Sequence, residues 1–343
     1  LVLVEWPERA GTRLMPQALT IRLDHEGAGR RAAIRGEGPA FERVARALML
    51  RDFLAGAGWG EAERRPFAGD ASARSYEIVS LPGEFDRVLM NAPALVLGPP
   101  VRDGKAYAEI AHTSRTIAAF VAVAAALREA GIAVPEVHAC DLDHGFALLS
   151  HLGTGNFLVD GEPVAERYIA VAELLAFMHR RRWNRTLPAA PGVVHTVPPY
   201  DRDAMLIEVE LLVDWYVPYV TGRPAAEPLR VGVRTVWNRL LDRLEGCEET
   251  LVLRDVQAPN IVWRPERAGR DRLGMLDFQD ALYGPSAYDV ASIAFDPRVT
   301  VPPEMERQTL DAYLAARRGD AGFDEAAFVE SYAIMAAQRN SKI

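Results

Sequence analysis

Residues 253–260, Leu-Arg-Asp-Val-Gln-Ala-Pro-Asn, and residues 277–280, Asp-Phe-Gln-Asp, decide the fold of this chain. They place an aspartate, an asparagine five residues later and a second aspartate on adjoining loops. Phosphoryl transfer from a metal-bound nucleotide requires such groups, because the protein must position an acceptor hydroxyl and hold a metal ion against the phosphates. We therefore expect a kinase active site.

Three residues carry this prediction. Asp255 would accept the proton of the acceptor hydroxyl as a general base. Asn260 and Asp277 offer the hard oxygen ligands that Mg²⁺ prefers. Residues 261–263 and 273–276 are predicted to form two strands joined by a polar turn, which would bring Asp277 back beside Asn260.

A nucleotide-binding lobe is predicted upstream. Residues 67–79 are typical of strand, small-residue turn and strand, a geometry in which backbone N–H groups approach phosphate oxygens. A third strand at 87–90 would lead to an alanine-rich helix at about 108–130, with the last strands at 136–140 and 146–150. The expected nucleotide contacts are Gly69, Asp70, Ala71 and Ser72 in the turn, and Ser150, His151 and Leu152 in the hinge after the last strand.

Strand three lacks the lysine with which kinases bind phosphate. Met90 stands in its place, and the two lysines of the chain, Lys105 and Lys342, lie outside the strands of this lobe. Arg74 or Arg87 is the candidate replacement, although arginine presents a planar fork where lysine presents a point charge.

These motifs, with residues 284–289 (Gly-Pro-Ser-Ala-Tyr-Asp), resemble the aminoglycoside phosphotransferase family, which is related to the protein kinases. Arg254 and Asp255 stand where the kinase His-Arg-Asp motif ends, with Leu253 replacing the histidine. The resemblance spans about residues 45–343. It implies an α+β, bilobal protein-kinase-like fold, with a small antiparallel-sheet N-lobe and a mainly helical C-lobe, and it implies use of ATP and Mg²⁺. It also implies that Asp289 supports the catalytic loop.

Within this family the chain resembles the kinases that phosphorylate the anomeric hydroxyl of N-acetylmuramate and N-acetylglucosamine in cell-wall recycling. The shared features are the Gly-Asp-Ala-Ser turn, Val-Leu-Met on strand three, and residues 208–216, 277–281 and 337–340. The resemblance implies an N-acetyl amino sugar as substrate. A kinase for an aminoglycoside, choline or another hydroxylated metabolite is one alternative. Another is a nucleotide-binding pseudokinase that acts as an adaptor in tRNA threonylcarbamoyladenosine synthesis, which Met90 and Leu253 favour and the complete base-and-metal set disfavours.

Acidic residues of the C-lobe are candidate sugar ligands. Glu208 and Asp214 lie on a helix predicted to begin at Asp201 or Asp203 and to continue to about residue 216. Six residues of helix separate them by about 120°, so each would contact a sugar separately. A solvated helix face is the alternative for both.

Two further candidates lie beside the catalytic residues. Gln257 follows Asp255 on the same loop, and Asp280 follows the predicted metal ligand Asp277. Gln257 is therefore expected close to the acceptor, and Asp280 is expected to orient either the sugar or the metal.

Residues 1–40 resemble the C-terminal end of TsaE, a P-loop ATPase subunit of the tRNA threonylcarbamoyladenosine system. Strands are expected at 19–23 and 30–34. Five residues separate Gly98 from the Gly104-Lys105 pair where a Walker motif has four, so no ATPase of its own is expected. The predicted domains are residues 1–40, an N-lobe at 41–153 and a C-lobe at 154–343. The amino-sugar kinases that this chain resembles continue beyond the segment that corresponds to residues 338–343. We therefore expect an incomplete gene product.

The composition favours a cytoplasmic enzyme. Of the 343 residues, 49% are hydrophobic and 25% are charged, and the net charge of −8 disfavours nucleic acid as a partner. The longest apolar run, near 117–127, is about half a membrane span. Two cysteines, Cys140 and Cys247, lack the spacing of metal ligands, and no basic leader begins the chain. The expected partner is a small-molecule sugar, without nucleic acid or membrane, and the oligomeric state is left open.

Overall fold

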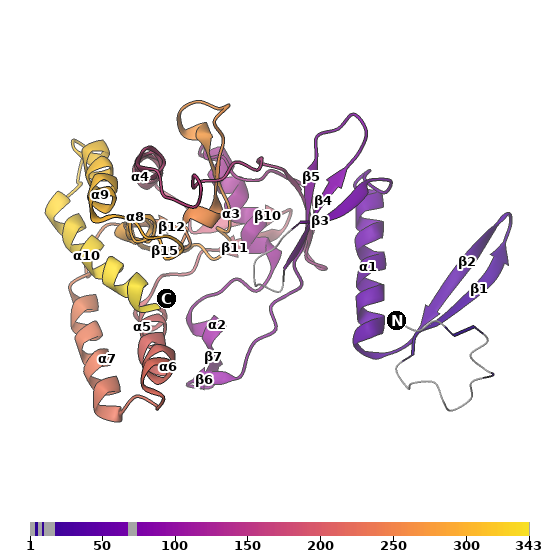
Figure 1. Ribbon diagram of the computed structural model, residues 1–343, viewed down its shortest axis with the longest axis horizontal. Coiled ribbons are helices and arrows are strands. Elements are labelled where there is room, and N and C mark those ends of the chain that lie inside the picture. The colour runs from indigo at the N-terminus through magenta and orange to yellow at the C-terminus, as the bar shows by residue number, and fades with distance from the viewer. Residues whose placement is uncertain (1–3, 6–8, 10–17, 68–73, 343) are drawn as a thin grey trace. The chain divides into compact units, whose positions relative to one another are not determined.

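The computed structural model describes residues 4–5, 9, 18–67 and 74–342 (Figure 1). The chain divides into two compact units. One comprises Leu1–Arg64 and Val79–Glu84, and the other comprises Arg65–Ile78 and Phe85–Ile343. The predicted phosphate turn, Gly69, Asp70, Ala71 and Ser72, lies outside the described residues.

The first unit contains a hairpin and a helix. Strands β1 (Thr20–Glu26) and β2 (Gly29–Arg35) pair antiparallel and together form a two-stranded sheet. Gly27 adopts a φ of 60° in the connecting turn, a conformation that glycine adopts without steric cost. Helix α1 (Gly38–Gly56) begins before residue 40, so the domain boundary predicted there falls inside a helix.

A five-stranded antiparallel sheet follows, and most of its residues belong to the second unit; the first two residues of β3 and the last two of β4 belong to the first unit. The strand order is β3-β4-β5-β9-β8, and β5 pairs with β9 so that Met90 faces Ala147 across the sheet. The predicted strands at 87–90, 136–140 and 146–150 are therefore confirmed. Their bounds are β3 (Glu63–Phe67), β4 (Ser75–Ser80), β5 (Arg87–Asn91), β8 (Val137–Asp141) and β9 (Phe146–Ser150).

The single helix predicted at about 108–130 is wrong. The chain forms a short helix α2 (Tyr107–Ile110) and a separate helix α3 (Ile117–Glu129). His112 interrupts the helical backbone with a φ of 54°, and the side chain of Thr116 caps α3 by accepting a hydrogen bond from the N–H of Ala118. The break creates a loop at 111–116 whose residues reach the functional site described below.

The rest of the second unit is mainly helical, with short strand pairs between the helices (Figure 1). Helix α4 packs against α9, and α10 packs against α8 and α5. The elements are β6 (Pro100–Arg102), β7 (Lys105–Ala106), α4 (Ala165–His179), β10 (Thr186–Ala190), β11 (Val193–Thr196), α5 (Arg202–Val209), a π-helical turn (Leu212–Tyr216), α6 (Val217–Thr221), α7 (Glu227–Asp242), β12 (Glu249–Val252), a 3₁₀ turn (Ala258–Asn260), β13 (Ile261–Trp263), a second 3₁₀ turn (Gly269–Arg272), β14 (Leu273–Met275), β15 (Leu282–Pro285), α8 (Ala287–Ala294), α9 (Pro303–Arg317) and α10 (Glu325–Lys342).

The helix predicted from Asp201 or Asp203 to residue 216 is not one regular α-helix. Asp201 is the cap, since its carboxylate accepts a hydrogen bond from the N–H of Ala204 at 2.9 Å. Helix α5 ends at Val209, and a π-helical turn follows. In the described part of the chain no helix is both long and apolar enough to span a bilayer.

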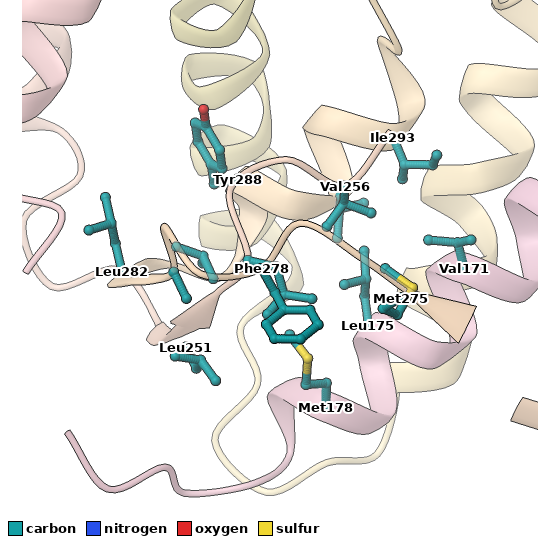
Figure 2. Packing of buried hydrophobic residues seen from close by; sticks show 14 of the residues in the cluster. Val171, Leu175, Met178, Leu251, Val256, Met275, Phe278, Leu282, Tyr288 and Ile293 are labelled. Atoms are coloured by element: carbon teal, nitrogen blue, oxygen red, sulfur yellow. The ribbon is translucent and has the colours of Figure 1, made fainter. Parts of the chain in front are cut away.

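The motif residues stand on a continuous apolar core. Phe278, from the Asp-Phe-Gln-Asp motif, is fully buried and stacks on Phe120 of α3 with ring centroids 5.0 Å apart. Figure 2 shows Phe278 among buried side chains from α4, such as Met178, and from the neighbouring strands, such as Leu251. Close packing of this kind fixes the backbone of the loops that carry the polar groups.

Candidate active site

A cleft of about 670 Å³ lies in the second unit. This volume is typical of small-molecule sites. One part of its lining is apolar and includes Val88, Met90 and Leu149 of the sheet. Another part is polar and includes Asn260 and Asp277.

The predicted hinge borders this cleft. Ser150, His151 and Leu152 all line it, as does Met90, which is 2% exposed. Ser150 is anchored to Glu136 by two hydrogen bonds: its N–H donates to the Glu136 carbonyl at 2.9 Å, and its hydroxyl accepts from the Glu136 N–H at 2.8 Å. The hinge is therefore held in place beside the apolar lining.

Asn260 and Asp277 converge at the polar part of the cleft, as the hairpin of β13 and β14 predicts. The side-chain amide of Asn260 donates to Asp277 Oδ2 at 3.3 Å. The Asp277 Oδ1 atom accepts from Gln279 Nε2 at 2.7 Å and from Arg74 Nη1 at 3.3 Å. Asp277 has a φ of 57°, which is uncommon for a residue other than glycine and is typical of functional loops.

Negative charge is crowded at Asp277. Burial raises the pKa of this carboxyl, and the charges of Asp255 and Asp280 raise it further, while the contacts with Gln279 and Arg74 lower it. A bound cation would relieve this repulsion, and carboxylate and amide oxygens suit Mg²⁺. The described residues hold no cluster of three or more His, Cys, Asp or Glu side chains fit for a metal. A two-residue oxygen set nevertheless suits a Mg²⁺ ion that also binds phosphates.

The backbone of the loop that carries Asp255 is fixed on both sides of this residue. The buried carboxylate of Asp289 accepts from the N–H groups of Leu253 at 2.6 Å and Arg254 at 2.9 Å. The Asn260 amide donates to the Asp255 carbonyl at 2.9 Å. Arg254 adopts a φ of 76°, so these bonds hold a backbone conformation that a residue with a side chain rarely adopts.

A buried ionic cluster lies behind this loop. Arg254, 4% exposed, donates to the Ala111 carbonyl at 2.9 Å and pairs with Glu208, which has no exposed surface. Glu208 also accepts from Tyr200 Oη at 2.5 Å and Gln338 Nε2 at 2.9 Å, and it lies 3.1 Å from Lys342 Nζ.

Burial alone would raise the pKa of Glu208, but Lys342 and Arg254 outweigh it and lower the pKa to about 2. Glu208 is thus ionised and surrounded by protein, neither on a solvated helix face nor open to a sugar. Glu208 does not line the cleft, so its contact with a sugar stays a prediction.

The other predicted sugar ligands are dispersed. Asp214 lies on the π-helical turn, is exposed, pairs with Arg230 and does not line the cleft. Gln257 is 7% exposed and does not line the cleft either. Asp280 does line it, and its Oδ1 accepts from the N–H of Ser114 in the loop between α2 and α3 at 2.7 Å.

Two residues at the site escaped prediction. Gln279 orients Asp277 through the bond already described. Arg339 of α10 is 2% exposed and donates to Asp255 Oδ1 at 3.2 Å. The motif at 337–340 contained a signal for Arg339, but a sequence motif does not show where a distant helix packs.

The fold and the polar loops around the cleft define a protein-kinase-like phosphotransferase. The chain belongs to the phosphotransferase enzyme family (APH), whose profile matches residues 63–328. The enzyme class and the α+β, protein-kinase-like fold predicted from the sequence are confirmed. The match begins at residue 63, so the resemblance of residues 1–40 to TsaE stays a prediction.

Similar proteins agree with this assignment. An N-acetylmuramate/N-acetylglucosamine kinase of Caulobacter vibrioides is 31% identical over 292 residues, covering 82% of this chain and 79% of its own length. A kinase of the same name from Pseudomonas aeruginosa is 31% identical over 274 residues, covering 77% and 70%. Among solved structures, an ethanolamine kinase of Plasmodium vivax matches with a TM-score of 0.56 at 13% identity, covering 89% of this chain and 82% of that one. The GDP and kanamycin complex of an aminoglycoside phosphotransferase matches with a TM-score of 0.51 at 14% identity, covering 87% and 90%.

Proposed function

We propose that this protein is an ATP- and Mg²⁺-dependent kinase that phosphorylates the anomeric hydroxyl of an N-acetyl amino sugar, N-acetylmuramate or N-acetylglucosamine. The observation that carries the proposal is that the Asn260 amide donates both to Asp277, with which it lines the cleft, and to the backbone carbonyl of Asp255, in a chain 31% identical to kinases named for these sugars. Its nucleotide requirement supports a cytoplasmic site of action.

The nucleotide base binds between the hinge and the apolar lining. Met90, Val88 and Leu149 supply an apolar surface for adenine, and the backbone of residues 150–152 supplies polar contacts. Met90 occupies the strand position at which kinases carry a phosphate-binding lysine, so the phosphates need another cation.

Arg74 is that cation. Of the two candidates from the sequence, Arg74 lines the cleft and Arg87 does not. Its guanidinium already lies 3.3 Å from Asp277 Oδ1. Lys342 is engaged with Glu208, and Lys105 is exposed on β7. Arg74→Met should therefore weaken nucleotide binding, which titration calorimetry measures, and Arg87→Met is the matched control.

The chain's own residues perform the transfer. Asp255 accepts the proton of the sugar hydroxyl. The sugar oxygen then attacks the terminal phosphate of the nucleotide. Asn260 and Asp277 would hold Mg²⁺, which supplies charge neutralisation at the phosphates. Asp289 keeps the loop that carries Asp255 in place.

The test is incubation with Mg-ATP and each sugar, followed by ³¹P NMR. N-acetylglucosamine or N-acetylmuramate should give an anomeric phosphate signal, and their 1-O-methyl glycosides, which lack the attacking hydroxyl, should give none. Asp255→Asn should reduce turnover by on the order of 10²–10⁴-fold, the usual contribution of a general base. Phosphate on a methyl glycoside, or on kanamycin alone, would exclude the anomeric assignment.

A further inference from the structure

Helix α10 brings one buried arginine to the catalytic loop. Arg339 Nη1 donates to Asp255 Oδ1 at 3.2 Å and to Tyr288 Oη at 3.3 Å, and Nη2 donates to Gln257 Oε1 at 3.4 Å. Its guanidinium carbon also lies 5.9 Å from the centre of the Tyr288 ring. One side chain thus contacts two residues of the loop and a residue of α8.

The contact with the Asp255 carboxylate differs from the others on this loop. Asp289 binds the N–H groups of Leu253 and Arg254, and Asn260 binds the Asp255 carbonyl, so all three bonds fix the backbone. Arg339 instead binds the Asp255 side chain. In the described structure the direction of the proposed base is therefore set from α10.

The hydrogen bonds of Arg339 are too long to contribute much to the stability of the fold. They measure 3.2–3.4 Å, and Arg339 Nε has no partner among the described residues. Arg317, which is equally buried, forms bonds of 2.6 Å to Asp320 and 2.7 Å to Glu248. Because burying a charge with long bonds and an unpaired donor costs free energy, folding alone is a weak reason for Arg339.

We propose that Arg339 is a positioning residue that holds the Asp255 carboxylate toward the acceptor hydroxyl and aligns Gln257 beside it. This inference rests on the proposed function, in which Asp255 is the base. The proton passes from the sugar hydroxyl to Asp255, the sugar oxygen bonds to the terminal phosphorus, and ADP leaves. Arg339 takes no proton and contacts no substrate; it reduces the freedom of the carboxylate before the transfer.

The experiment compares Arg339→Met and Arg339→Lys with Arg317→Met as a control of equal burial. Sugar-dependent kcat, KM and the calorimetric Kd of Mg-ATP are measured on folded protein, with thermal unfolding alongside. Arg339→Met should lower kcat on the order of 10–10²-fold, less than loss of the base, and leave the nucleotide Kd unchanged. Arg339→Lys should have a kcat between those of the wild type and Arg339→Met, because lysine keeps the positive charge but lacks the planar set of N–H donors of the guanidinium. Arg317→Met should lower the unfolding temperature and leave kcat unchanged.

A double-mutant cycle with Asp255→Asn separates positioning from a purely structural effect. If Arg339 acts through Asp255, adding Arg339→Met to Asp255→Asn should cause little further loss. Additive losses, or wild-type kcat in Arg339→Lys and Arg339→Met, would overturn the inference. Should Arg339→Met fail to fold, the cycle uses Arg339→Lys instead. The decrease in kcat that Arg339→Lys causes in the wild-type background must then be absent in the Asp255→Asn background. Absence of sugar phosphate with the wild-type enzyme would instead contradict the proposed function.

Discussion

Glu208→Gln tests whether the buried carboxylate holds the site together. The substitution preserves shape but removes the negative charge that Arg254 and Lys342 share, each largely enclosed by protein. Leaving buried charges without their partner destabilises proteins by about 3–5 kcal/mol. We therefore expect the midpoint of thermal unfolding to fall by roughly 6–10 °C.

Glu210→Gln is the matched control, only two residues away. Glu210 pairs with Arg102 and Arg234, whose side chains are 23% and 52% exposed. Solvent can replace much of that interaction, so the loss should be about 1 kcal/mol or less. Each variant removes one carboxylate. The two variants differ mainly in how deeply the cations that pair with that carboxylate are buried.

The assay combines scanning calorimetry with steady-state kinetics on the folded fraction. Glu208→Gln should unfold earlier than Glu210→Gln, and its KM for sugar should stay near that of the wild type. Unchanged thermal stability together with a raised sugar KM would refute this reasoning, because Glu208 would then be a substrate ligand after all.

Three further predictions follow the same logic. Asp277→Asn should weaken calorimetric binding of Mg-ATP but not of metal-free ATP, since it removes an oxygen anion from the predicted metal site; equal losses with and without Mg²⁺ would move the metal elsewhere. Burial lowers the pKa of His179 to about 3, so below pH 6.5 the unfolded chain binds a proton at His179 that the native protein does not; in urea titrations the stability of the wild type relative to His179→Gln should therefore fall by about 2 kcal/mol between pH 7 and pH 5. Removing residues 1–36, which ends before α1, should leave kcat unchanged; a folded but inactive product would show that this segment belongs to the site.

Local patterns predicted much of the fold. Asn260 and Asp277 meet because a short hairpin of β13 and β14 returns the chain, and strand periodicity with a polar turn is readable in sequence. The sequence also shows that Met90 replaces the kinase lysine, because the strand pattern of residues 87–90 fixes its position in β5.

Long-range packing could not be predicted in the same way. Glu208 looked like a surface acid, since nothing nearby in sequence reveals that Lys342 and Arg254 enclose it. The break between α2 and α3 was missed because the alanine-rich composition favours helix throughout, whereas the left-handed backbone at His112 interrupts it.

Helix α10 lies after the rest of the site in the sequence, yet it supplies Gln338, Arg339 and Lys342 to that site. During synthesis, Glu208 and the loop that carries Asp255 emerge from the ribosome before Lys342 and Arg339, which pair with Glu208 and Asp255 respectively. The site is therefore incomplete until α10 docks against α8 and α5. If Asp255 is the base, a nascent chain in which α10 has not yet docked would not hold its carboxylate in the working orientation.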